Sequence, residues 1–521
     1  MLNRLLTYFI TLLLSVFVLP LNAASPKRTS VAAVITVEGL SSDYLRMLED
    51  FLSPGGLKRL MSTGATIERL YYGPAIDAAA ASAIVMTGAA PMTNGIPGEK
   101  VYDTTTHLTR SPLYDKKVIG NFTDETFSPA PIKVSTIADE VIIHSDGLGR
   151  VYSLAPRSFE AIIGAGHAGN GAYWINDMTA VWSSSAYYKD MPEAVRNRNY
   201  RNSLASRLDT MRWTPLYNLS LYPGLSDNQL KKPFSNRFPG KDIQRVRRFL
   251  DSPLANTEVT DLALELINEA HIGHNSANAT DMICLAYNVP TVGSRVEILD
   301  SYLRLDRDIA RLLNALDTAA PGSLTVMLAA TPSTDGASAD DQRYNIPSGL
   351  YSVKRALSLL GIQLMAVHGN GDWILGYSNR HFYLNRKLIK DRGLSLQDFR
   401  REVADFLGRM AGISNVLTID DIMASRAGDD PAALKRNTSL EHAGDVIIEV
   451  SPGWQIVDDG TGRASGVQRH SATDMPAFFI GPDIRRIQYD QPIDARTLAP
   501  TLARLLLIRA PNGASVPALH L

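Results

Sequence analysis

The polar residues best placed to carry chemistry lie at the ends of strand-like apolar runs. Glu38 ends the run 31–37, and three further turns, 288–293, 331–333 and 470–476, each adjoin another such run. Where strands are parallel, ligands bind outside their carboxyl ends. Carboxylates at that edge suit hard cations such as Ca²⁺ and Mg²⁺, so these four turns form the candidate site.

Thiolate and imidazole chemistry has little support. Cys284 is the only cysteine, so the chain can form neither an internal disulfide nor a thiolate zinc cluster. It lies in the apolar run 282–287, which is typical of a buried, unreactive thiol. His470 is the only histidine near one of the four turns, whereas His271 and His274 have a spacing more typical of a solvated turn than of a ligand pair.

Alternating strands and helices are expected to position these turns. Continuous apolar runs predict buried strands, and apolar residues that recur every three or four positions predict helices packed on a sheet. This pattern predicts an α/β fold with a largely parallel central sheet and helices on both faces. The expected strands are 31–37, 282–287, 324–330 and 477–480, and the expected helices include 41–61, 298–316 and 496–507.

The beginning of the chain predicts export. Residues 5–18 are almost unbroken apolar sequence after Arg4, and small residues at Ala23 and Ala24 offer a cleavage site, as in a signal peptide spanning 1–23. The run is shorter than the about 20 residues of a membrane-spanning helix. We therefore expect a periplasmic or secreted protein with no membrane span in its mature chain.

The mature chain, 24–521, is expected to be a single domain with insertions at about 147–241 and 344–436, because strand-like core segments resume after each of them. Packing on the core is a simpler role than glycan binding for the aromatic residues of the first insertion, Tyr173, Trp174, Trp182, Tyr187 and Tyr188. The 52 Lys and Arg residues balance 53 Asp and Glu, which argues against a nucleic-acid partner.

Several motifs together resemble the alkaline phosphatase superfamily, and within it the periplasmic phosphate-irrepressible phosphatases near the type I phosphodiesterase/nucleotide pyrophosphatase branch. The resemblance covers nearly the whole mature chain and implies an alkaline phosphatase-like fold. It depends on residues 37–45 (Val-Glu-Gly-Leu-Ser-Ser-Asp-Tyr-Leu), 86–88 (Met-Thr-Gly) before 94–96 (Asn-Gly-Ile), 166–168 (Gly-His-Ala) with 171–174 (Gly-Ala-Tyr-Trp), 300–306 (Asp-Ser-Tyr-Leu-Arg-Leu-Asp), and 444–446 (Gly-Asp-Val) with 452–454 (Pro-Gly-Trp).

The resemblance implies two zinc ions that activate a Ser or Thr nucleophile and stabilise a transferring phosphoryl group. Counted back from residues 87–88, the nucleophile position falls on Ala78, whose methyl group cannot attack phosphorus. Asp77 or Ser82 would replace it only with a shifted register or a bent helix.

The phosphoryl-binding positions implied by the resemblance are also altered. The Asn that contacts phosphoryl oxygens falls on Glu99, where a carboxylate would repel a phosphate dianion. The Lys-x-Arg pair of this branch falls on Arg157 and Phe159, so one cation is kept and the other is replaced by an aromatic ring.

The metal-ligand positions implied by the resemblance lack imidazoles. The turn 288–293 holds neither carboxylate nor imidazole where an Asp-x-x-x-His pair is expected. The following Asp-His pair falls on Thr331 and Pro332, and a shifted register would place Asp335 there instead. We expect the matched positions to converge at one edge of the sheet, with Ala78 at the start of a helix facing them. These positions are Glu38, Thr331, Pro332 and Asp474.

Two functions remain open from the sequence. The first is a catalytically inactive homologue, a pseudophosphatase, that binds an unidentified ligand or protein partner and holds no zinc. The second is a metal-dependent phosphomonoester or phosphodiester hydrolase with a rearranged site, in which Glu38, Asp474 and Asp335 hold one hard cation such as Ca²⁺ or Mg²⁺.

Overall fold

The computed structural model describes residues 28–521 except 190, 231–232, 241–242, 292, 334–347, 427–430, 452, 459–462 and 466–474. The expected signal peptide, 1–23, therefore lies outside the described residues. Within the described part of the chain, no helix is both long enough and apolar enough to cross a bilayer.

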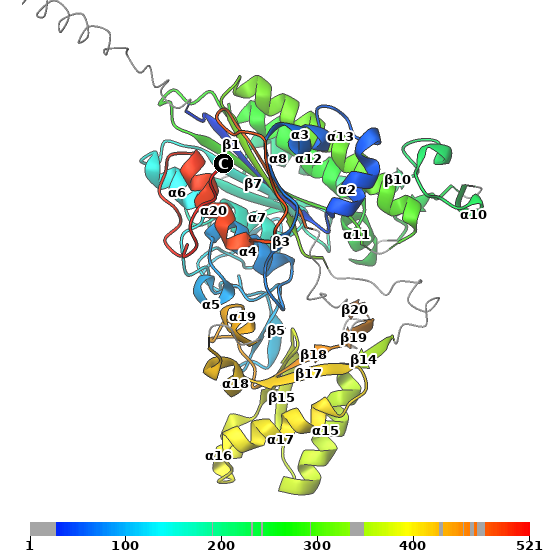
Figure 1. The fold of residues 1–521 in the computed structure, drawn as a ribbon, viewed down its shortest axis with the longest axis vertical. Coiled ribbons are helices and arrows are strands. Elements are labelled where there is room, and N and C mark those ends of the chain that lie inside the picture. The colour runs from blue at the N-terminus through cyan, green and yellow to red at the C-terminus, as the bar shows by residue number, and fades with distance from the viewer. Residues whose placement is uncertain are drawn as a thin grey trace, which may run out of the picture.

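A ten-stranded sheet forms the core (Figure 1). Its central strands are parallel, whereas β21 and β9 run antiparallel to their neighbours. In spatial order the strands are β22 (Ile487–Tyr489), β2 (Ala65–Ile67), β21 (Ala477–Ile480), β13 (Leu324–Thr331), β1 (Val31–Glu38), β12 (Asp281–Asn288), β7 (Val151–Ala155), β8 (Gly171–Ile175), β9 (Trp182–Ser185) and β6 (Gly120–Asn121).

Strand β1 is buried on both faces because its side chains alternate between two apolar clusters. Val31, Ala33, Ile35 and Val37 pack in one cluster, and Ala32 and Val34 pack in the other. Helices on both faces of this mixed sheet confirm the predicted α/β class, and the strands at its centre are parallel as expected. One face carries α2 (Ser42–Leu48), α3 (Leu57–Thr63), α8 (Glu193–Tyr200), α11 (Ile243–Leu250), α12 (Pro253–Glu269) and α13 (Arg295–Ala319); the other carries α4 (Ala78–Thr87), α6 (Ile137–His144), α7 (Ser158–Ala165) and α20 (Leu498–Leu505).

A smaller unit with its own apolar cluster adjoins the core (Figure 1). Its four-stranded sheet has the order β15, β16, β18, β17, and a second sheet has the order β14, β19, β20. Its elements are β14 (Gly349–Ser352), α15 (Val353–His368), β15 (Ile374–Ser378), β16 (His381–Leu384), α16 (Arg386–Asp391), α17 (Leu396–Gly408), β17 (Ile413–Thr418), α18 (Ile419–Ala424), α19 (Pro431–Arg436), β18 (Val446–Val450), β19 (Trp454–Asp458) and β20 (Arg463–Ser465).

The boundaries of both expected insertions differ from the structure. The segment 147–241 begins with β7, β8 and β9, which belong to the central sheet, so the elaboration on this side follows β9. These strands are only four or five residues long and rich in Tyr, Trp, Ser and Gly, which hides their core character. The smaller unit extends beyond 436, because β18 lies between β16 and β17 in its sheet.

Hydrogen bonds and an aromatic contact join the two units. The Tyr102 hydroxyl donates to the Leu375 carbonyl, and its ring lies 4.7 Å from that of Tyr383. The Asn437 side-chain amide donates to the carbonyls of Tyr72, at 3.2 Å, and Pro74, at 2.7 Å. Asn437 therefore fixes the segment that leads into α4.

The turn after β1 offers a stability test. Gly39 has φ +79°, and a Cβ there would lie 2.6 Å from the Val289 carbonyl oxygen, whereas Gly147, with φ +81°, has open space around it. We expect Gly147→Ala to lower the free energy of unfolding by about 1 kcal/mol through backbone strain alone. Gly39→Ala should cost at least about 1 kcal/mol more, because a backbone carbonyl must also move. Guanidinium denaturation of both variants measures the difference, and equal losses would contradict the tight packing beside Glu38.

Candidate functional site

The site lies where three parallel strands end together. Glu38, the last residue of β1, is the register partner of Asn288 on β12 and of Thr331 on β13. The Gly39 amide donates to the Thr331 carbonyl at 3.0 Å, and the Val289 amide donates to the Glu38 carbonyl at 2.9 Å. The backbone thus places the Glu38 side chain at the carboxyl edge of the sheet, beside two of the other predicted turns.

Arg157 is the central charge of this edge. It is the N-cap residue of α7, directly after β7, and its Nη1 lies 2.6 Å from Glu38 Oε2 and 3.7 Å from Glu99 Oε1. Its Nη2 lies 3.9 Å from Asp251 Oδ1. The Glu38 charge, followed by those of the other carboxylates, raises the pKa of Arg157 above its usual value, against the opposing effect of burial. The structure therefore brings Glu38, Glu99 and Arg157 together.

The N-terminus of α4 faces the same cluster through Asp77. This N-cap residue accepts from the Ala80 amide at 3.0 Å and from the Glu99 amide at 2.8 Å. Burial, and secondarily the Glu38 charge, raise the pKa of Asp77, although the hydrogen bonds from the backbone oppose them. Ala78 is the first residue of the helix and is buried. Asp77 thus links the helix start to the loop that carries Glu99.

Glu160 is a buried carboxyl that the sequence motifs did not identify. It lies in the first turn of α7 and is 6% exposed, and its Oε2 has no hydrogen-bond partner among the described residues. The pKa of Glu160 is raised to about 8, mainly by burial. The charges of Glu38 and Glu99 also raise it, whereas Arg157 lowers it. The only sequence signal was its position three residues after Arg157.

Glu99 has a shifted pKa as well. The pKa of Glu99 is raised to about 7, first by desolvation and then by the Asp77 and Glu38 charges, although Arg157 opposes them. Asp251, also absent from the sequence expectations, extends the acidic group on the other side of Arg157. Four carboxylates besides Asp77 therefore surround a single guanidinium.

The other predicted positions are distributed as follows. Thr331 and Pro332 are buried beside Glu38. Phe159 packs in the apolar cluster that holds α4 and α7, away from solvent. Asp474 and the alternative Asp335 lie outside the described residues.

The turn at 288–293 uses its polar side chain structurally. Asn288 Nδ2 donates to the Leu250 carbonyl at 2.8 Å, and the Asn288 backbone exchanges hydrogen bonds with the Asn256 side chain. Asn288 Oδ1 is buried without a partner among the described residues. Within the part of the chain that the structure describes, no group of three His, Cys, Asp or Glu side chains has the arrangement of a metal site.

Comparisons with known proteins agree with this fold. The sequence profile of the type I phosphodiesterase / nucleotide pyrophosphatase family matches residues 32–473. The chain is 27% identical over 514 residues to a "Calcium-transporting ATPase" of Myroides odoratus, covering 92% of each protein. It is 25% identical over 515 residues to "Alkaline phosphatase PafA" of Elizabethkingia meningoseptica, covering 94% of this chain and 93% of that one.

A solved structure shows the same architecture. The crystal structure of wild-type alkaline phosphatase PafA superposes with a TM-score of 0.82 at 24% identity, over 94% of this chain and 98% of that one. The family match spans both the central sheet and the smaller unit. The chain therefore belongs to the type I phosphodiesterase / nucleotide pyrophosphatase family of the alkaline phosphatase superfamily.

Proposed function

We propose that the protein is a catalytically inactive member of this family that binds a ligand or protein partner. We further propose that it acts in the periplasm or outside the cell after removal of residues 1–23. The observation that carries the proposal is the ion pair between Arg157 and Glu38, 2.6 Å long, inside a group of carboxylates. The protein's own guanidinium there neutralises the carboxylate that would otherwise be available to a metal ion.

The residues around Ala78 support inactivity. Ala78 has no hydroxyl, and the Ser82 hydroxyl donates to the Ala78 carbonyl at 2.8 Å within α4. Asp77 uses both carboxyl oxygens as a helix cap and as an acceptor for Glu99. Neither alternative nucleophile is therefore free to attack, and phosphoryl transfer requires an activated one.

The donor set does not fit a pair of zinc ions. Catalytic zinc is bound by thiolates, imidazoles and carboxylates in tetrahedral shells that keep one position open. At this edge Glu38 is paired with Arg157, Thr331 offers a neutral hydroxyl, and Pro332 has no donor atom. The acidic surroundings would also repel a phosphate dianion.

One observation favours the second candidate, a hydrolase that uses a single hard cation. Glu160 Oε2 and Asn288 Oδ1 are buried oxygens without partners among the described residues, and oxygen ligands suit Ca²⁺ and Mg²⁺. This function also requires Asp474 or Asp335. Metal analysis and phosphatase assays separate the two candidates.

Metal content is the first test. Protein purified without chelator should contain well below one zinc ion per chain, because the predicted ligand positions lack imidazole and thiolate donors. Elemental analysis of the mature protein measures this directly. Stoichiometric zinc would contradict the proposal, whereas substoichiometric Ca²⁺ or Mg²⁺ would be compatible with it.

Activity is the decisive test. Turnover of aryl phosphate monoesters and diesters should stay at background, and Ala78→Thr alone should not restore it, because a hydroxyl without a metal remains a weak nucleophile at neutral pH. The assay includes Ca²⁺ and Mg²⁺. Hydrolysis by the unmodified protein that Glu38→Ala or Asp474→Ala abolishes would establish the hydrolase instead.

The proton on Glu160 predicts a pH dependence of stability. Folded Glu160 keeps its proton up to about pH 8, whereas its reference pKa is 4.5, so the folded state binds more protons between these values. The free energy of unfolding therefore falls as pH rises through this window. Between pH 4.5 and about pH 8, the free energy of unfolding should fall less in Glu160→Gln than in the wild type. Denaturation curves recorded at a series of pH values measure this difference. The exposed Glu49→Gln serves as control, and equal slopes for all three proteins would contradict a protonated Glu160.

A further inference from the structure

A small cavity lies between the core and the smaller unit, separate from the Arg157 cluster. Its volume is about 20 Å³, enough for one water-sized atom or ion. The core contributes the segment around Lys100, the smaller unit contributes the tip and second strand of the β15–β16 hairpin, and the loop 437–443 closes it. Among the described residues that line it there is no Asp or Glu.

The hairpin tip adopts a costly conformation that brings Arg380 to the cavity. Asn379 and Arg380 connect β15 to β16 with φ values of +47° and +71°, the pattern of a type I′ turn, in which glycine is preferred at the second position. An arginine there costs on the order of 1 kcal/mol. The tip packs closely on the core, because a Cβ at Gly98 would lie 2.7 Å from Asn379 Nδ2. Arg380 thus occupies a position where conformational preference alone would favour glycine.

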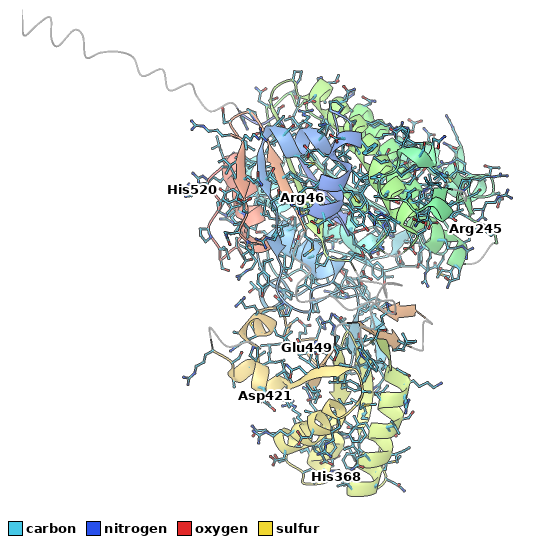
Figure 2. All side chains as sticks on the ribbon, turned by 45° about the vertical axis from the view of Figure 1, so that its right-hand side comes forward. Arg46, Arg245, His368, Asp421, Glu449 and His520 are labelled. Atoms are coloured by element: carbon cyan, nitrogen blue, oxygen red, sulfur yellow. The ribbon has the colours of Figure 1, made fainter. Side chains whose placement is uncertain are left out.

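No described residue forms an ion pair with the Arg380 side chain, although Glu449 and Asp77 act on its charge from a distance. Within the described residues neither Arg380 nor Lys100 forms an ion pair. Burial lowers the pKa of Arg380, and the charges of Tyr377, Glu449 and Asp77 do not offset that effect. Figure 2 shows Glu449 on the side of the smaller unit that faces the core. A desolvated cation without an ion pair is costly unless an anion accompanies it.

Neutral donors complete the lining. His381 Nδ1 accepts from the Gly444 amide at 3.1 Å, and burial together with Arg380 lowers the pKa of His381 to about 4. The neutral ring therefore carries its proton on Nε2, which has no acceptor among the described residues. Ser439 is 3% exposed, and its hydroxyl likewise has no hydrogen-bond partner in the described part of the chain. Both side chains line the cavity.

We propose that this cavity binds a small inorganic anion that bridges the core and the smaller unit. Lys100, Arg380, His381 and Ser439 all line a space that has no carboxylate among its described lining residues, and such a set of donors suits an anion. The volume of about 20 Å³ selects a monatomic halide over oxyanions and organic anions. Since Lys100 belongs to the core and Arg380 to the smaller unit, the bound anion would stabilise the contact between them. The site is independent of the proposed function, because it uses neither Arg157 nor Glu38.

Thermal unfolding at equal ionic strength tests this site. Wild-type protein is transferred from sodium gluconate, whose anion is too large for the cavity, into sodium chloride and, separately, sodium bromide. We expect at least one of these anions to raise the Tm by about 2 °C or more, through binding to the folded state only. Arg380→Gln should abolish this gain and Ser439→Ala should reduce it. Arg401→Gln, at an exposed residue whose nearest carboxylate is 3.8 Å away, is the matched control and should keep it.

The variants separate specific binding from general salt effects. An equal gain in the wild type and in Arg380→Gln would assign it to the general stabilising action of salts and would overturn the proposal, as would the absence of any gain with both anions. If Arg380→Gln fails to fold, Lys100→Gln and Ser439→Ala take its place. Isothermal titration calorimetry of the active anion into the wild type should give one site per chain, and that heat should be lost in the cavity variants but not in Arg401→Gln.

Discussion

The burial of β1 on both faces and along both edges is the constraint on which the site depends. Its eight residues are all buried, β12 and β13 pair with it on either side, and its side chains divide between the two apolar clusters. A strand held in this way cannot slip by one residue without exchanging its two faces. Glu38 is therefore fixed at the edge of the sheet, where the chain leaves the core through the left-handed Gly39.

The chemistry of that edge follows from its charge balance. Arg157 is brought to Glu38 because β7 lies next to β12 and ends directly before α7. One guanidinium faces the carboxylates of Glu38, Glu99, Asp251 and Glu160, and the cluster reduces its charge by raising the pKa values of Glu99 and Glu160. Carboxyl groups still outnumber the single guanidinium at this edge, so its surroundings stay acidic. In the proposed function, this edge of the sheet lacks the concentrated positive charge and the activated nucleophile that metal-dependent phosphoryl transfer uses.

Charges of opposite sign lie on the two sides of the loop 97–101. Glu99 turns toward Arg157 and the acidic cluster, whereas Lys100 lines the cavity with Arg380. Asp77 interacts with both sides of this loop. It accepts a hydrogen bond from the Glu99 amide, and its charge partly opposes the lowering of the Arg380 pKa by burial. The smaller unit therefore contributes electrostatically to the surroundings of the core site, although its own apolar cluster is separate.

The sequence by itself determined the family, the buried strands and the absence of a hydroxyl at Ala78, because continuous apolar runs and motif spacing are local properties of the chain. It did not reveal β7, β8 and β9 as core strands, since short strands rich in Tyr, Trp, Ser and Gly do not produce a continuous apolar run. Only the tertiary structure decided that Arg157 pairs with Glu38, 119 residues away, that Glu160 is buried beside them, and that Lys100 and Arg380 share a cavity. Burial and charge contacts of this kind depend on which strands become neighbours, and one-dimensional patterns do not carry that information.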